Sequence, residues 1–263
     1  MDKEKKLIIL FIGWVLALSF LVFWGPLAMV PFAMPRSFWY TVWFVLGWFV
    51  PSMVGLVLIR RSDGKQGIKE VLKRTFDVRV GWDVLLTLLM MLGILVLGQV
   101  LLSRFSTTCF DLNLFRRQSA RLLPLFILGP LSEEFGWRGF LQPQMERFFS
   151  PLLTSAMIGL IWGIWQYPLF LILGTVQRGL QMSFIPSVVQ LMLLSMVFTY
   201  AYHHTHKSIG VSILIHWIYG YALLVLSMGR PNIPWIEWIS LIPMLLIAVL
   251  LLAETPFKKD KRA

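Results

Sequence analysis

Residues 129–142 read GPLSEEFGWRGFLQ, and they lie inside a hydrophobic run that extends over Leu122–Met145. Glu133, Glu134 and Arg138 are ionisable residues within this run. Each costs about 2.5–3.5 kcal/mol at the centre of a membrane helix, so such side chains normally face a protein interior or a wet cavity. The stretch therefore predicts a membrane protein whose helices gather around a buried polar site.

The composition of the whole chain supports a membrane location. Of its 263 residues, 57% are hydrophobic and only 14% are charged, whereas soluble domains average about 25% charged residues. The net charge of +11 comes from short clusters between apolar runs. Such clusters favour anionic lipid headgroups over nucleic acid as the partner. The single cysteine, Cys109, excludes an internal disulfide framework and a thiolate metal cage.

The apolar runs predict about eight transmembrane helices, because each is close to or above the roughly 20 residues that a membrane helix needs. The runs are Leu7–Pro35, Ser37–Ile59, Trp82–Leu102, Leu122–Met145, Phe148–Gln177, Gly179–His206, Ser208–Met228 and Pro234–Ala253. The first and fifth are long enough to tilt or to include an interfacial turn. We therefore expect an all-α, polytopic fold that forms a single membrane domain over residues 1–263.

The distribution of Lys and Arg predicts the orientation of these helices. With eight spans, most of the basic residues lie on the side of the N-terminus, chiefly in residues 60–79 and 258–262. Because cytoplasmic loops carry the excess of Lys and Arg, both termini are predicted to be cytoplasmic. The basic segment 60–80 is the sole candidate for a soluble element, and its simplest interpretation is a connector.

The acidic cluster suggests a division of roles between its two carboxylates. Glu134 and Arg138 are four residues apart on a helix and can form an ion pair. Glu133 points roughly 100° away, which leaves it unpaired and free to face a cavity. A carboxylate in that position is a candidate general base for a water molecule. The alternative is a buried charge network that only holds the helices together.

Polar residues in two later runs are candidate partners of the cluster. Gln166 lies in Trp162-Gly-Ile-Trp-Gln166, just before the bend expected at Pro168. Its amide can orient a water but cannot carry a proton; an interhelical hydrogen bond is the alternative. His216 is a candidate acid or base, metal ligand or oxyanion donor, or else a satisfied core histidine. Tyr219 follows three residues later, on the same helix face.

Other ionisable residues in the apolar runs lie near predicted membrane edges. His203, His204 and His206 cluster where the sixth run ends, and an interfacial loop is the simpler interpretation than a metal site. Asp83 and Glu237 are also edge residues, and we assign them no role.

Together, these residues resemble three ordered motifs of the CAAX-prenyl-protease and bacteriocin-processing (CPBP, or ABI) family of intramembrane proteases. The motifs are, in chain order, Glu133-Glu134-x-x-x-Arg138, Trp162-x-x-x-Gln166 and His216-x-x-x-Gly220. The first matches the family closely. The second normally ends in His, and the third normally ends in Asn. Their order and spacing match the family core over about residues 120–225, and the eight-helix count also fits.

The resemblance implies peptide-bond hydrolysis in a cavity, acting on a membrane-bound or lipidated peptide. It implies that Glu133 activates a water, with Gln166 at the position of the family histidine, and that Glu134 and Arg138 support the site. His216 and the residue at position 220 would stabilise the oxyanion or hold a metal. Family members are described both with a divalent metal such as zinc and without one; with a metal, Glu133 and His216 would be its ligands.

The two departures from the family pattern keep other functions open. Gln166 is a poor zinc ligand, and Gly220 removes an oxyanion donor, a type of loss that costs about 10²–10³ in rate. The chain could therefore be a weakened or inactive member that acts as a membrane binding or immunity-type protein. A transporter with a carboxylate proton relay is a third class, but no pair of matching broken helices marks two halves of the sequence.

Overall fold

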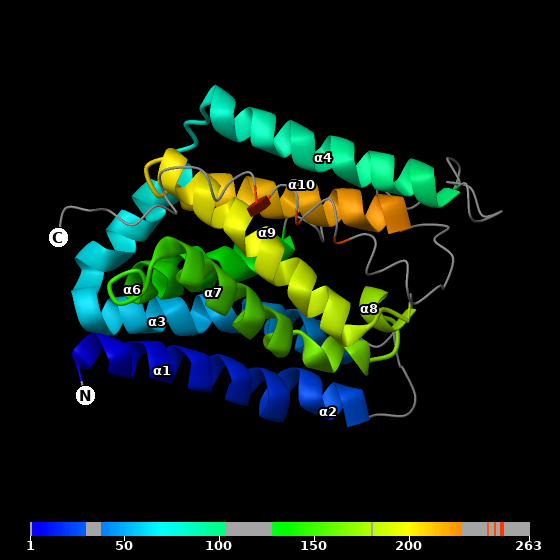
Figure 1. The fold of residues 1–263 in the computed structure, drawn as a ribbon. Coiled ribbons are helices and arrows are strands. Elements are labelled where there is room, and N and C mark those ends of the chain that lie inside the picture. Colours follow the sequence, from blue (N-terminus) through cyan, green and yellow to red (C-terminus); the bar gives the residue numbers. More distant parts are fainter. Residues whose placement is uncertain are drawn as a thin grey trace.

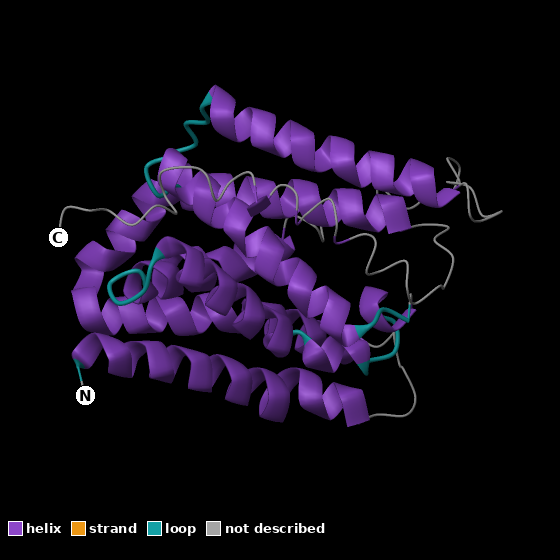
Figure 2. Ribbon diagram, viewed as in Figure 1, coloured by secondary structure: helices purple, strands orange, loops and turns teal. Residues whose placement is uncertain are grey.

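The computed structural model describes residues 2–29, 38–103, 128–179 and 181–227, together with positions 241, 245, 248 and 249. These residues form helices and turns, with no strand among them, as Figure 2 shows, which confirms the predicted all-α fold. The helical elements are α1 (Lys3–Ala17), the π-helix η1 (Leu18–Phe23), α2 (Trp24–Met29), α3 (Phe38–Phe76), α4 (Trp82–Ser103), residues 128–134, the π-helix η2 (Phe135–Leu141), α6 (Gln142–Met145), α7 (Pro151–Trp165), the 3-10 helix η3 (Tyr167–Phe170), α8 (Val176–Gly179), α9 (Phe184–His204) and α10 (Ile209–Ser227).

The helices are stacked in one bundle, with α1 and α2 along one edge and α4 along the opposite edge (Figure 1). In the middle, α7 packs along α9, and η2 packs against α3. α10 contacts α3, α4 and α9. The elements that carry the three motifs, η2, α7 and α10, therefore lie inside the bundle.

The lengths of the helices agree with a membrane protein. Three are long and apolar enough to cross a membrane, namely Lys3–Met29, Phe38–Phe76 and Phe184–His204. Shorter apolar helices cover Trp82–Gly93, Pro151–Trp165 and Ile209–Gly220. These six fall in six of the eight predicted runs. The fourth run is helical from residue 128, and most of the eighth, Pro234–Ala253, lies outside the described residues.

The long fifth run contains a turn rather than one tilted helix. α7 ends at Trp165, and the chain continues into η3. Pro168 lacks a backbone N–H and its ring crowds the preceding turn, so an α-helix does not pass through it. The end of α7 places Gln166 at the helix terminus rather than in its interior.

Residues 60–80, interpreted as a connector, are helical rather than a loop as far as Phe76, because α3 continues to that residue. Gly64 breaks the helix with φ of 66°, a left-handed conformation that glycine adopts readily. After this break the chain runs across the end of the bundle towards α4 (Figure 1). We call residues 65–76 the basic arm: Lys65, Lys69 and Lys73 are exposed along one face, while Val71 is buried.

Glycines allow the helices around the site to approach closely. A Cβ on Gly159 would lie 2.4 Å from the Cα of Met192, so α7 meets the backbone of α9 there. Gly163 follows four residues later, which is the small-x-x-x-small spacing of membrane helix contacts. A Cβ on Gly136 would lie 2.4 Å from the carbonyl oxygen of Pro51. The position of η2 against α3 therefore depends on the absence of a side chain at residue 136.

Replacing Gly136 with alanine should destabilise the protein, because the added Cβ has to displace the backbone of Pro51. Overpacking of this kind typically costs about 1–3 kcal/mol. The measurement is the apparent melting temperature in a mild detergent. Gly139→Ala is the matched control in the same π-helix, since its Cβ would find its nearest neighbour at an ordinary 3.6 Å. Equal melting temperatures for the two variants would contradict the close contact.

Candidate active site

The acidic motif lies where an α-helix changes to a π-helix. Residues 128–134 are α-helical, and η2 begins at Phe135, directly after Glu134. π-helical turns insert an extra residue into a helix and occur frequently at functional sites. The N–H of Gln142 accordingly donates to the carbonyl of Trp137, five residues back. The turn carries Trp137 and Arg138 into the bundle interior, where both are fully buried.

The predicted ion pair between Glu134 and Arg138 is present. Arg138 Nη1 lies 3.2 Å from Glu134 Oε2, and both side chains are 0% exposed. The guanidinium also lies 4.1 Å from the ring centre of Phe198 and donates to Ser195 Oγ over 3.5 Å. The carboxylate, the hydroxyl and the aromatic face around the cation offset part of the cost of its burial, although Arg138 Nε has no hydrogen-bond partner among the described residues.

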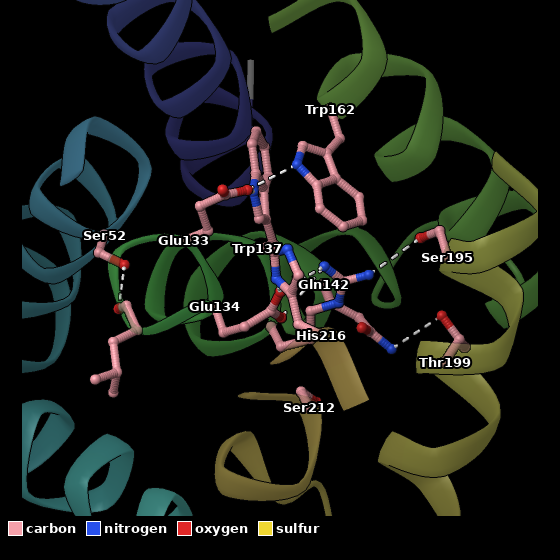
Figure 3. Close-up of polar contacts among 12 residues, drawn as sticks. Ser52, Glu133, Glu134, Trp137, Gln142, Trp162, Ser195, Thr199, Ser212 and His216 are labelled. Carbon is pink, nitrogen blue, oxygen red and sulfur yellow. Dashed lines mark hydrogen bonds and ion pairs between the residues drawn. The ribbon is translucent and has the colours of Figure 1, made fainter. Parts of the chain in front are cut away.

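His216 joins the same carboxylate. Its Nδ1 donates to Glu134 Oε1 over 2.8 Å, across 82 residues of sequence (Figure 3). Since an ionised carboxylate only accepts hydrogen bonds, the proton of this bond belongs to Nδ1. A carboxylate partner fixes the tautomer and the ring orientation of a histidine, and it leaves Nε2 for a second partner. Glu134 thus orients His216 as well as neutralising Arg138.

Glu133 has partners that the sequence analysis did not predict. It was expected to be unpaired, but its Oε2 accepts hydrogen bonds from Trp162 Nε1 over 2.7 Å and Trp137 Nε1 over 3.4 Å (Figure 3). Glu133 is 6% exposed. No side chain among the described residues donates to its other oxygen, Oε1. The carboxylate is therefore held through one oxygen, and the second oxygen is available to a water.

Trp162 connects the two carboxylates of the motif. Its N–H donates to Glu133, while its ring lies 5.0 Å from the His216 ring and 5.2 Å from the Arg138 guanidinium. Trp162 belongs to the second predicted motif, but no role was predicted for it. Trp137 could have been suspected, because it follows Glu133 by four residues, as Arg138 follows Glu134.

The other predicted site residues are Gln166, Tyr219 and Gly220. Each lies within about one helical turn of Trp162 or His216 in the sequence. Gln166 is half-buried at the end of α7, one turn after Trp162. Within the described residues, no hydrogen bond links it to Glu133 or His216. Tyr219 is buried in α10, one turn after His216, and half-buried Gly220 follows it. The roles of Gln166, Tyr219 and Gly220 in the site therefore stay predictions.

A second polar group lies one to two turns further along the motif helix. Glu146 Oε1 accepts hydrogen bonds from Gln142 Nε2 and His203 Nε2, each over 2.9 Å. Gln142 Nε2 also donates to Thr199 Oγ1 over 3.4 Å (Figure 3). His203 and His204 are the last residues of α9 rather than part of a loop. The predicted loop at this histidine tract is therefore wrong for these two residues.

The donor set at the site does not fit a zinc ion. Structural and catalytic zinc sites use at least three protein ligands from Cys, His and carboxylates. In the part of the chain that the structure describes, no three such side chains come together. Glu133 Oε2 receives two indole N–H groups, which are not ligands, and Glu134 already faces Arg138 and His216. The two predicted ligands, Glu133 and His216, thus have other partners.

Comparison with known proteins gives two matches. The family model "Type II CAAX prenyl endopeptidase Rce1-like" matches residues 116–222, which include all the residues discussed above from Glu133 to His216. The chain is also similar to CAAX prenyl protease 2 of Methanococcus maripaludis. The two are 21% identical over 211 residues, which cover 75% of this chain and 77% of that protein. With the ordered motifs and the apolar helices, these matches support an integral membrane protein that is similar to the CPBP family of intramembrane proteases.

Proposed function

We propose that this chain is an intramembrane endopeptidase in which Glu133 activates the water that hydrolyses the peptide bond. The observation that carries the proposal is the asymmetric setting of Glu133, with Oε2 held by two indole N–H groups and no described donor on Oε1. A carboxylate fixed in this way can accept a proton from a water at Oε1 with little loss of orientation.

The proposed reaction uses Glu133, Glu134 and His216. The water oxygen adds to the scissile carbonyl carbon, and its proton moves to Glu133. The carbonyl oxygen becomes an oxyanion, and His216 is the donor nearest at hand. The Glu134 carboxylate lies 2.8 Å from Nδ1 and orients the ring, so that in its imidazolium form His216 would present Nε2–H to that oxyanion. When the carbon–nitrogen bond breaks, Glu133 returns its proton to the leaving amine.

We assign the remaining site residues to supporting roles. Arg138 forms the ion pair with Glu134, and Trp162 and Trp137 orient Glu133. Gln166, which was expected to position the water, is given no step in this scheme, because no hydrogen bond among the described residues links it to Glu133 or His216. The scheme needs no metal, in agreement with a donor set that does not fit zinc. Tyr219 and Gly220 lie beside His216 in sequence, and we propose that they line the substrate side of α10.

The substrate that we propose is a protein held at the membrane by a lipid group. The family relationship supports it, since the archaeal relative is named a CAAX prenyl protease. The predicted cytoplasmic location of both termini stays a prediction. A second candidate function is a membrane binding protein without catalysis. Gln166 and Gly220, in place of the family His and Asn, favour it.

Glu133→Gln separates the two candidates. It keeps an acceptor for the indole N–H groups but removes the base, so cleavage of a lipidated peptide in vesicles should fall by about 10²-fold or more. The melting temperature should change little, because no buried cation loses its partner. Residual cleavage equal to that of the wild type would exclude Glu133 as the base. A biological phenotype that survives the substitution would support the binding protein.

Trp162→Phe should lower kcat about tenfold with little change in KM, since a hydrogen bond to a charged group is worth about 1.5–3 kcal/mol. The ring that packs against His216 and Arg138 is largely kept. Steady-state cleavage of the same peptide is the measurement. Trp165→Phe is the matched control, because it removes a 2.7 Å indole bond to Ser19 away from Glu133. Equal losses of kcat in the two variants would argue against orientation of Glu133 by Trp162.

A further inference from the structure

The carbonyl group of Arg138 cannot form a normal helix hydrogen bond. In an α-helix its donor would be the N–H of Gln142, but that group donates to Trp137 because of the π-turn. In a π-helix, the carbonyl of Arg138 would instead accept from the N–H of the residue five positions later. That residue is Pro143, which has no N–H. A carbonyl in the bundle interior that lacks a partner is unfavourable, so a donor from another element is required there.

Arg74 of the basic arm supplies that donor. Its Nη2 donates to the Arg138 carbonyl oxygen over 3.3 Å and to the Tyr202 hydroxyl over 3.0 Å. Its Nε donates to the carbonyl oxygen of Lys207 over 2.8 Å. The guanidinium also lies 5.4 Å from the ring centre of Tyr202. One side chain therefore satisfies acceptors from three separate parts of the bundle.

These acceptors belong to the elements that build the site. Arg138 is in η2 and forms the ion pair with Glu134. Tyr202 is in α9, which also carries Ser195 and Phe198 against the Arg138 guanidinium. Lys207 is followed by Ser208, the residue directly before α10. The Ser208 hydroxyl donates to the carbonyl oxygens of Arg74 and Asp77. α10 carries His216 and begins directly after Ser208, so the basic arm is hydrogen-bonded to η2, to α9 and to the residues that precede α10.

Arg74 differs from the other cations of the arm. Lys65, Lys69 and Lys73 are exposed, whereas Arg74 is half-buried and points into the bundle. A planar guanidinium with donors in several directions suits this junction, and an ammonium on a flexible stem does not reproduce it. Replacing Lys73 therefore removes one positive charge from the basic arm but keeps the hydrogen bonds of Arg74, which makes it a suitable control.

We propose that Arg74 is a positioning residue, which replaces the backbone donor missing at Arg138 and thereby fixes the rotation of the motif helix. That rotation points Glu133 at Trp162 and Glu134 at His216. The effect on catalysis rests on the proposed function, whereas the structural link between Arg74 and the Arg138 carbonyl does not.

The experiment compares wild type, Arg74→Met, Pro143→Ala and the double variant, with Lys73→Met as the control. Arg74→Met removes all donors at similar length, and small misplacements of catalytic groups can cost up to about 100-fold. We expect kcat to fall about 10-fold to 100-fold with KM within about twofold, and Arg74→Lys to recover part of the loss. Pro143→Ala restores an N–H beneath the Arg138 carbonyl, so the loss on removing Arg74 should be clearly smaller in that background.

The melting temperatures of the same proteins give a readout that does not need activity. The decrease caused by Arg74→Met should be smaller in the Pro143→Ala background than in the wild type, and Lys73→Met should cause little change. Equal decreases in both backgrounds, or an effect of Lys73→Met as large as that of Arg74→Met, would overturn the proposal. If no variant cleaves any peptide but the coupling in melting temperature is present, the proposed function fails while the positioning role stands.

Discussion

The arrangement of this bundle depends on one buried cation. Arg138 is completely removed from water in a chain that otherwise offers few charges to the interior. A cation at membrane depth is tolerated only with a partner, and Glu134 at 3.2 Å is that partner. The same carboxylate then accepts a hydrogen bond from His216, while Ser195 and Phe198 close around the guanidinium. The ion pair thus brings residues from η2, α9 and α10 to one place.

The position of the motif at the start of the π-turn links the site to the rest of the bundle. Glu133 and Glu134 have different surroundings although they are neighbours in sequence, because successive helix residues point about 100° apart. Glu134 faces charged groups, and Glu133 faces two indoles. The turn has structural consequences elsewhere: Gly136 lies against the Pro51 carbonyl, and the Arg138 carbonyl needs Arg74. The site is therefore linked to the basic arm at the end of the bundle.

Most of the helices and one pair of site residues could be predicted from local sequence rules. The other contacts of the site depend on tertiary structure. Apolar runs predict helices because their length matches the bilayer. The Glu134–Arg138 pair follows from the four-residue spacing alone. In contrast, Trp162 is one of 12 tryptophans in the sequence, and only the packing of α7 beside η2 shows that its N–H meets Glu133. The helix after Gly64 was missed, because a glycine between clusters of charges is also typical of a loop. Gln166 was assigned to the site by its spacing, and the structure shows that it caps the end of α7, one turn after Trp162.

The bundle depends on the neutralisation of Arg138 by Glu134, and a double-mutant cycle in unfolding tests this pairing most directly. Breaking a buried pair by removing one partner typically costs about 3–5 kcal/mol, whereas replacing both partners with apolar or neutral groups is often nearly neutral. We therefore expect Glu134→Gln to lower the melting temperature strongly and the double variant Glu134→Gln/Arg138→Met to recover most of the loss. A single variant as stable as the wild type, or a double variant no more stable than the single, would contradict this account.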